Sequence, residues 1–151
     1  MLISLYVSKG RDMNVIRQNT DYALRVLVIL GRHYGKEPLS TRILARQGDI
    51  AYQFACKIMQ QLHQAGLVKS SMGPKGGFFL AKVPSKINLL QVIQALQGPV
   101  SINKCFGIEG CGRRRNCPVS AKLAGLQKQI EASLRSITLT ELLKTKTGKK
   151  T

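Results

Sequence analysis

The sequence predicts a mainly α-helical protein with a small β-hairpin: a winged helix-turn-helix domain followed by a long C-terminal dimerisation helix. Two short amphipathic stretches flank a turn at residues 48–49, which is the helix-turn-helix pattern. Two short apolar runs around a Gly/Pro cluster at 72–77 follow directly and indicate a hairpin in the position of a wing. After Pro118 a narrow apolar seam predicts the long helix.

The first predicted helix ends at about residue 33 and is expected to be buried. Asn19, Thr20 or Asp21 supplies the short polar side chain that favours a helix N-terminus. The run 22–30 is apolar nearly all round, which is typical of a helix enclosed by other elements.

The next two helices form the predicted helix-turn-helix. Ser40 is expected to cap a helix over 41–46, because its hydroxyl can accept an N–H of the first turn. Gly48 and Asp49 make the turn, and the third helix runs from about residue 52 to 64. The wing follows, with strands at 67–71 and 78–81.

The C-terminal half is predicted to contain a short helix over 88–98, an aperiodic segment and the long helix. The long helix has apolar positions that step by three and four, namely Val119, Leu123, Leu126, Ile130, Leu134 and Ile137. No second helix carries such a seam, so we expect the same helix of another copy to cover it, which makes a homodimer. Packing within the chain is the alternative. A capping-box pattern at 138–141 opens a last short helix.

These elements divide the chain into four predicted parts. They are an N-terminal extension (1–12), a winged helix-turn-helix domain (13–83), dimerisation helices with a cysteine-rich loop at 101–117 (84–143), and a basic tail (144–151). Residues 1–12 differ in character from the rest, and Met13 is a candidate second start.

The charge balance indicates a polyanionic partner. Lys and Arg number 24 against 7 Asp and Glu, a net charge of +17. A compact chain with this charge repels itself unless it meets nucleic acid or an acidic membrane surface. Because the basic residues are spread along the chain and not gathered on one amphipathic helix, the pattern favours nucleic acid. No apolar run approaches the length of a membrane span and none forms a signal peptide, so we expect a cytoplasmic protein.

The third helix supplies the candidate DNA-reading face. One face carries Phe54, Ala55, Ile58 and Leu62 and is expected in the core. The opposite face carries Gln53, Cys56, Lys57, Gln60, Gln61 and Gln64. Gln pairs with adenine and Lys reaches guanine or phosphate. The alternative is an ordinary solvent-exposed polar face, which has a similar composition.

Further contacts to the DNA backbone are expected around this face. Tyr52 begins the third helix and has a hydroxyl for a phosphate, and Ser40 and Thr41 begin the second. The loop Gly73, Pro74, Lys75 and Gly76 is small and cationic, so it can approach a phosphate closely. Cys56 is interpreted as a small residue near the DNA.

Three cysteines in the aperiodic segment form the candidate metal site. Cys105, Cys111 and Cys117 are separated by five residues each, among glycines that let a loop wrap a ligand. Thiolates suit iron–sulfur clusters and zinc, and the basic run 113–115 favours their deprotonated form. The spacing is poor for a structural zinc site and acceptable for an iron–sulfur cluster, while a thiol/disulfide switch stays open.

The chain resembles the winged-helix iron–sulfur transcription regulators typified by IscR and NsrR. The matching segments are 20–25 (TDYALR), 64–68 (QAGLV), 73–78 (GPKGGF), the cysteine triplet and 137–142 (ITLTEL). The resemblance implies a homodimer on a palindromic operator in double-stranded DNA. It also implies an iron–sulfur cluster (4Fe-4S or 2Fe-2S) on the three cysteines, and a regulator, expected to be a repressor, that responds to nitric oxide, redox change or cluster loss.

The same resemblance points to the fourth cluster ligand. IscR-type members use a His three residues after the third cysteine, and Ser120 occupies that position. NsrR-type members use an Asp at the start of the first helix of the other subunit, which implies Asp21 as the metal ligand here. A plain acidic residue favoured by the helix dipole is the alternative for Asp21.

No catalytic constellation accompanies these features. The few acids are scattered, and neither His33 nor His63 has an obvious Cys or Ser partner. The sequence therefore predicts a regulator and not an enzyme, with a thiol- or zinc-dependent winged-helix regulator without a cluster as the alternative.

Overall fold

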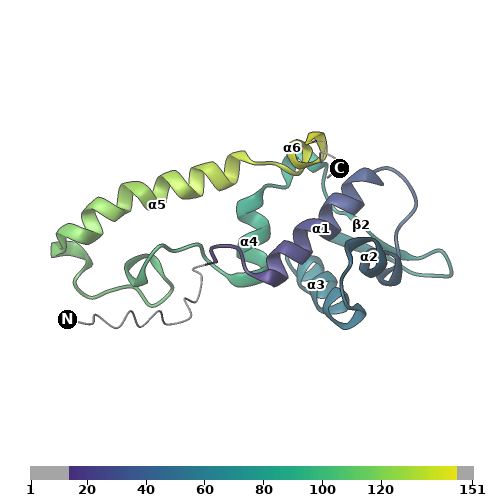
Figure 1. Ribbon diagram of the computed structural model, residues 1–151, viewed down its shortest axis with the longest axis horizontal. Helices are drawn as coiled ribbons and strands as arrows, with labels where there is room; N and C mark the ends of the chain where they lie inside the picture. Colours follow the sequence, from purple (N-terminus) through teal and green to yellow (C-terminus); the bar gives the residue numbers. More distant parts are fainter. Residues whose placement is uncertain (1–13, 146–151) are drawn as a thin grey trace, which may run out of the picture.

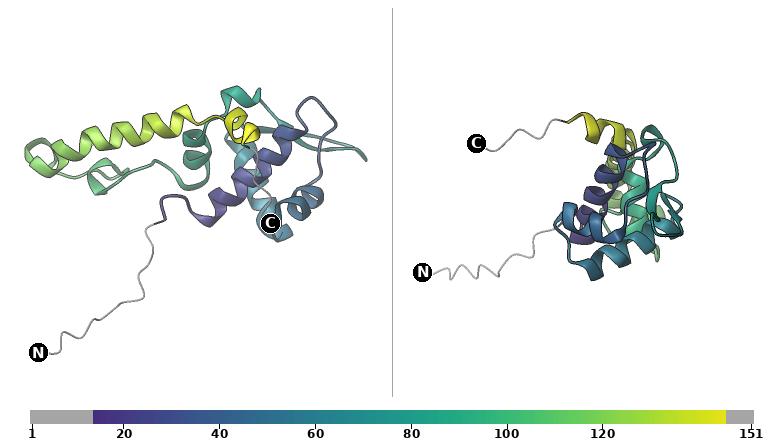
Figure 2. Two further views of the ribbon diagram at one scale, coloured as in Figure 1. Left: turned by 45° about the horizontal axis from the view of Figure 1, so that its top comes forward. Right: turned by 90° about the vertical axis from the view of Figure 1, so that its right-hand side faces the viewer.

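The computed structural model describes residues 14–145, and the predicted extension 1–12, Met13 and most of the basic tail lie outside them. The helix-turn-helix and the hairpin lie at one end, and the long helix α5 (Pro118–Ser136) extends away from it (Figure 1). A second view shows the same separation (Figure 2). Within the described residues no helix is both long and apolar enough to cross a membrane.

Helix α1 (Gln18–Arg32) begins earlier than the polar side chains suggested. Its N-cap is Arg17, which makes no side-chain capping bond, so the expected caps at Asn19, Thr20 and Asp21 are wrong. Thr20 is instead fully buried, and its hydroxyl donates to Gln97 Oε1 at 2.8 Å. The short polar side chain therefore joins two helices and does not end one.

Helices α2 (Thr41–Gly48) and α3 (Tyr52–Gln64) form the predicted helix-turn-helix. The Ser40 hydroxyl accepts from the Ile43 N–H at 3.4 Å and confirms the predicted cap. Asp49 closes α2 in the left-handed region at φ 52°, which Asp tolerates better than most residues. The bounds of α3 match the prediction.

Strands β1 (Val68–Ser71) and β2 (Gly77–Leu80) form the predicted antiparallel hairpin, with Val68 opposite Leu80. An extra bridge ties β2 to Leu39, the residue before the N-cap of α2. The Phe78 N–H donates to Leu39 O at 2.8 Å, and the Leu39 N–H donates to Phe78 O at 3.0 Å. The wing is thereby fixed to the start of α2.

Gly77 is required at this junction, because a Cβ there would overlap the Leu39 carbonyl. Gly77→Ala is expected to destabilise the fold by about 1–3 kcal/mol, as overpacking usually does. The thermal midpoint measures this loss. Gly125→Ala is the control: it lies in α5, nothing surrounds its Cβ position, and alanine there is expected to stabilise the helix. Equal midpoints for the two variants would contradict the requirement for glycine at position 77.

Helix α4 (Leu89–Gln97) begins in a capping box formed by Asn88 and Gln91. The segment that follows holds two single 3-10 turns, η2 (Lys104–Phe106) and η3 (Arg114–Asn116), and matches the predicted lack of period. Helix α5 (Pro118–Ser136) starts at the predicted proline, and α6 (Leu139–Lys144) starts in the predicted capping box. A third 3-10 turn, η1 (Pro84–Lys86), precedes α4.

The core is aliphatic and centres on α1. Helices α2, α3, α4 and α6 and strand β2 all pack against it. Leu27, Leu44, Ile58, Met59 and Leu62 are among its fully buried side chains. The predicted fold class, mainly helical with one hairpin, is confirmed, and the predicted burial of the first helix holds for the side that faces these neighbours.

Candidate nucleic-acid interface and cysteine loop

The predicted reading face of α3 is open to solvent. Gln53, Cys56, Lys57, Gln60 and Gln64 are exposed, and Gln61 is half-buried. They project from a helix whose other side is anchored in the core by Ala55, Ile58 and Leu62. A firmly held helix with an amide-rich outer face suits base recognition in a major groove.

Phe54 is a correction to the predicted core. Its side chain is 50% exposed, whereas Met59 is buried. Helical geometry explains the exchange, because the buried stripe of α3 runs through Ala55, Ile58, Met59 and Leu62 and Phe54 lies at its border.

The start of α3 contacts the start of α2. The guanidinium of Arg42 lies 5.8 Å from the centre of the Tyr52 ring, within the range of a cation–π contact. Tyr52 is exposed, and Ser40 and Thr41 are half-buried beside the wing junction. The structure thus brings the predicted backbone-contacting residues of both helices to neighbouring positions.

The wing loop is exposed at Gly73, Pro74 and Lys75. Gly73 has φ 107°, which only glycine adopts without strain, and the Gly76 N–H donates to Gly73 O at 2.9 Å. A Cβ at Gly76 would overlap the Ser71 carbonyl. These glycines therefore let the loop turn tightly and present the lysine outward.

The cysteine loop lies alongside α5, at the end of the molecule remote from the wing (Figures 1 and 2). Cys105, Cys111 and Cys117 are half-buried thiols, whereas Cys56 is exposed on α3, in a different part of the fold. Burial raises the pKa of the Cys105 thiol, and its hydrogen bond with Cys111 and the nearby charges of Cys111 and Cys117 raise it further. A hydrogen bond with Ser120 opposes this shift.

Two contacts brace the loop. The side-chain amide of Gln127, which is buried on α5, accepts from the Ile102 N–H at 3.0 Å and donates to Val100 O at 2.6 Å. The guanidinium of Arg114 lies 5.1 Å from the centre of the Phe106 ring and joins the two halves of the loop. The first contact holds the incoming arm of the loop against α5, at whose start Cys117 lies.

The donor set fits an iron–sulfur cluster in its chemistry. Three soft thiol ligands share one loop, and the basic run 113–115 lies between Cys111 and Cys117 in the sequence. Among residues 14–145 of a single protomer, however, no group of three His, Cys, Asp or Glu side chains lies close enough together to hold a metal ion. One protomer therefore brings neither the three cysteines nor Asp21 with them into a formed metal site.

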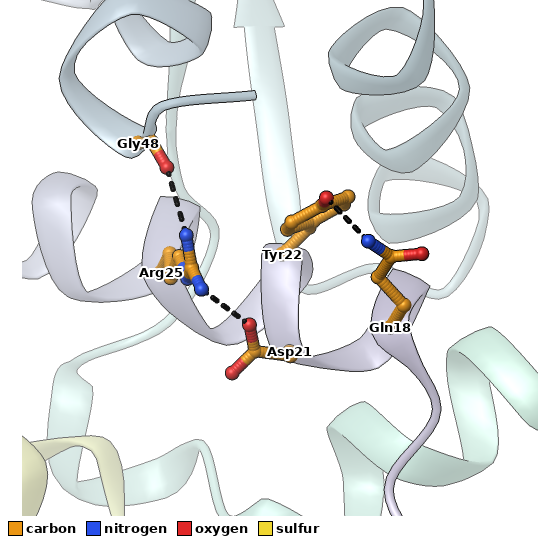
Figure 3. A network of polar contacts seen from close by, with 5 residues as sticks. All are labelled: Gln18, Asp21, Tyr22, Arg25 and Gly48. Atoms are coloured by element: carbon orange, nitrogen blue, oxygen red, sulfur yellow. Dashed lines mark hydrogen bonds and ion pairs between the residues drawn. The ribbon is translucent and has the colours of Figure 1, made fainter. Parts of the chain in front are cut away.

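Asp21 lies on α1 in a polar network that reaches the helix-turn-helix (Figure 3). Its carboxylate pairs with the Arg25 guanidinium at 2.9 Å, and both side chains are about half exposed. Arg25 also donates to the Gly48 carbonyl at the end of α2, at 3.4 Å. Asp21 is thus linked to the turn between α2 and α3 through Arg25, which contacts both.

Asp21 and Arg25 also border a groove of about 560 Å³ on the outer side of α1. Its floor is largely apolar and includes Leu24, Val28 and Leu142. The first helix was predicted to be buried, and along this groove one protomer leaves α1 uncovered.

The predicted seam of α5 is also partly uncovered in one protomer. Val119 is 60% and Leu126 46% exposed. The only residues of α5 that the protomer buries are polar, Ser120 and Gln127. The rest of the seam is half-buried and consists of Leu123, Ile130, Leu134 and, just after the helix, Ile137.

Three functional positions escaped sequence reasoning. Gln97 accepts from the Arg17 N–H at 3.1 Å and from the Thr20 hydroxyl, and so ties the start of α1 to the end of α4. Gln127 and Phe106 brace the cysteine loop. Single Gln and Phe residues carry no motif, and only the long-range contacts reveal them.

Comparison with known proteins gives a consistent result. Residues 16–145 match the family model Rrf2, described as an iron-dependent transcriptional regulator. The HTH-type transcriptional regulator IscR of Erwinia tasmaniensis is 36% identical over 116 residues, which cover 77% of this chain and 69% of the relative. IscR of Photorhabdus laumondii is 30% identical over 122 residues, 81% of this chain and 74% of the relative.

Solved structures share the fold. IscR of T. potens superposes with a TM-score of 0.68 and 27% identity, over 89% of this chain and 90% of that one. CymR, the global cysteine regulator of B. subtilis, superposes with a TM-score of 0.68 and 25% identity, over 85% of this chain and 95% of that one.

Proposed function

The chain belongs to the Rrf2 family of DNA-binding transcriptional regulators, and we propose that it is a homodimeric repressor controlled by an iron–sulfur cluster in the loop around Cys105, Cys111 and Cys117. The observation that carries this proposal is the loop itself, in which three half-buried thiols share one short segment and Cys111 and Cys117 lie near enough to Cys105 to raise the pKa of its thiol. The family is one of regulators, so the sequence-based exclusion of an enzyme is confirmed.

Operator binding is assigned to α3 and the wing. The exposed amides of Gln53 and Gln60 and the ammonium of Lys57 read base edges, while Tyr52, Ser40 and Thr41 hold the backbone. Gly73, Pro74, Lys75 and Gly76 reach an adjacent phosphate. Cys56 lies in the same face as a small contact residue.

Lys75→Ala is expected to weaken binding to every DNA sequence by a similar factor. It should also lower the steepness of log affinity against log salt by about 1 per wing. Each phosphate contact that forms releases counterions from the DNA, so a complex that lacks one contact releases fewer of them. Titration of operator and unrelated duplexes at several salt concentrations measures both. An unchanged salt slope would remove the phosphate contact from the wing.

Dimerisation is assigned to the two uncovered apolar surfaces. The exposed Val119 and Leu126 of α5 and the groove on α1 have no cover within the described part of one protomer. A second copy supplies an identical seam, and closed twofold assembly covers both surfaces at once. The resulting dimer suits a palindromic operator.

The cluster ligands are assigned to the three cysteines and to Asp21 of the partner subunit. When bound, an iron–sulfur cluster supplies a centre that reacts with nitric oxide and changes with redox state. Asp21 borders the groove on α1 that the dimer covers, and Arg25 joins its carboxylate to the Gly48 carbonyl. An Asp21 carboxylate that served as a ligand would pair less strongly with Arg25, which would loosen the link from Asp21 to the Gly48 carbonyl at the α2–α3 turn.

Control by thiols alone is the second candidate. Cys111 lies near enough to Cys105 to raise the pKa of its thiol, and an oxidant that takes two electrons and two protons from this pair would leave a disulfide. The structural neighbour CymR is named a cysteine regulator. A zinc-dependent regulator is the remaining alternative from the donor chemistry.

An absorbance spectrum of anaerobically purified protein, with iron and sulfide assays, tests the cluster. A broad visible band that changes with a nitric-oxide donor is expected. A colourless protein that takes up neither iron nor sulfide on anaerobic reconstitution would leave the thiol- or zinc-dependent regulator.

A further inference from the structure

Phe54 is the large apolar side chain that α3 leaves in solvent on its outer side. It is 50% exposed, although the buried stripe of the same helix is complete without it. A single exposed apolar residue is common on protein surfaces and is not evidence of a role. A role for Phe54 therefore rests on the residues around it.

That position is beside the reading face. Phe54 lies three residues before Lys57 and seven before Gln61, which puts the three side chains on neighbouring turns of one helix side. Together with Asn19 of α1 they line a hollow of about 320 Å³. Apart from Phe54 and part of Ile58, the hollow is bordered by polar or charged side chains.

This mixture of groups suits a base-pair edge better than an apolar protein surface. A protein partner would bury a wider apolar patch, whereas here one ring lies among amides and an ammonium in a chain of net charge +17. On the floor of the major groove the C5-methyl of thymine is the one apolar group among donors and acceptors. The adenine of the same base pair is the base that a glutamine amide recognises.

We infer that Phe54 is a specificity-determining residue that contacts the C5-methyl group of one thymine in each operator half-site. Gln61 or Gln60 of the same helix supplies hydrogen bonds to an adenine at or next to the base pair that contains this thymine. The inference rests on the DNA contact assigned to α3 under the proposed function, and it does not depend on the cluster.

A deoxyuridine scan tests this contact. The operator is first obtained by selection from random duplexes with the wild-type dimer. Each thymine is then replaced in turn by deoxyuridine, which removes only the methyl group, and the affinities of wild type, Phe54→Ala and Phe54→Leu are compared. Wild type is expected to lose about fourfold per half-site at one symmetric position, the value for one buried methyl-sized group.

The variants separate a methyl contact from a general effect. Phe54→Ala should bind the thymine operator more weakly and lose nothing further on deoxyuridine substitution, and Phe54→Leu should keep part of the difference. Tyr52→Phe is the matched control: Tyr52 is also 50% exposed at the start of α3, and its variant should bind more weakly but keep the deoxyuridine pattern. Because Phe54 is outside the core, the thermal midpoint of Phe54→Ala should stay close to that of wild type.

Three results would overturn the inference while leaving the proposed function intact. The first is a deoxyuridine scan without a sensitive position, and the second is a sensitive position whose penalty is the same in Phe54→Ala. The third is unchanged operator affinity in Phe54→Ala, which would reject the contact between the exposed ring and DNA. If no operator is selected at all, DNA binding itself is absent and both proposals fail.

Discussion

Replacing Cys105 with alanine is expected to abolish the visible absorbance of the anaerobically purified protein, together with its iron and sulfide. Cys105 is one of three proposed thiolate ligands, and Cys111, Cys117 and Ser120 all lie near enough to influence the pKa of its thiol. A cluster left with two protein thiolates lacks the ligands that hold it in comparable sites. Absorbance and metal analysis of wild type and variant, purified side by side, measure the effect.

Cys56→Ala is the matched control for this experiment. Cys56 is a free thiol of the same chain, exposed on α3 and remote from the loop. Its variant should keep the full absorbance and the full iron content. A Cys105→Ala protein with the colour of wild type would remove Cys105 from the ligand set.

Leu126→Glu is expected to convert the proposed dimer to monomers. Leu126 is 46% exposed in one protomer and lies in the middle of the α5 seam, so a carboxylate there would be tolerated by the protomer and buried by the proposed dimer. Burying an unpaired charge costs several kcal/mol, so at least about 3 kcal/mol, or a hundredfold, should be lost from dimerisation. Analytical ultracentrifugation gives the dissociation constant, and operator affinity should fall with it.

Ala132→Glu places the same charge on the exposed opposite side of α5 and should leave the dimer intact. The thermal midpoint of the Leu126→Glu monomer, measured at low concentration, separates loss of assembly from loss of folding. A Leu126→Glu protein that dimerises like wild type would place the interface elsewhere, and the seam would then be an ordinary solvated face.

Local signals in the sequence predicted the helix-turn-helix and wing well. The bounds of α3 and the strands of the hairpin follow from the Gly/Pro cluster at 73–77 and the periodicity before it. The Ser40 cap and the capping boxes before α4 and α6 are also local, because donor and acceptor are three residues apart. Such features need no knowledge of the rest of the fold.

Long-range contacts account for the errors. Thr20 looked like a cap because its hydroxyl is short and polar, but its partner is Gln97, 77 positions away. Phe54 looked like a core residue because the periodicity of α3 does not show whether the buried stripe extends to Phe54 on one border or to Met59 on the other. The surfaces of α1 and α4 that decide both outcomes cannot be read from either segment alone.

The cysteine ligands of the candidate site stay a prediction from the sequence, whereas the contacts that support the loop were not predicted. Three cysteines at regular spacing identify the loop, whereas the Gln127 amide that holds residues 100–102 against α5 has no sequence signature. Asp21 was placed by resemblance, and its pairing with Arg25 and, through it, with Gly48 emerged only from the fold (Figure 3). If Asp21 ligates a cluster on the partner subunit as proposed, its pairing with Arg25, which also contacts Gly48, would link that cluster to the turn before the reading helix.

The most direct test of the account is the operator affinity of a single anaerobic preparation, measured by fluorescence anisotropy before and after its cluster iron is removed with a nitric-oxide donor. The account predicts a change of about tenfold or more, as expected for coupled sites, with Cys105→Ala fixed at the iron-free value under both conditions. Equal affinities of the iron-containing and iron-free dimers would contradict control of DNA binding by the cysteine loop.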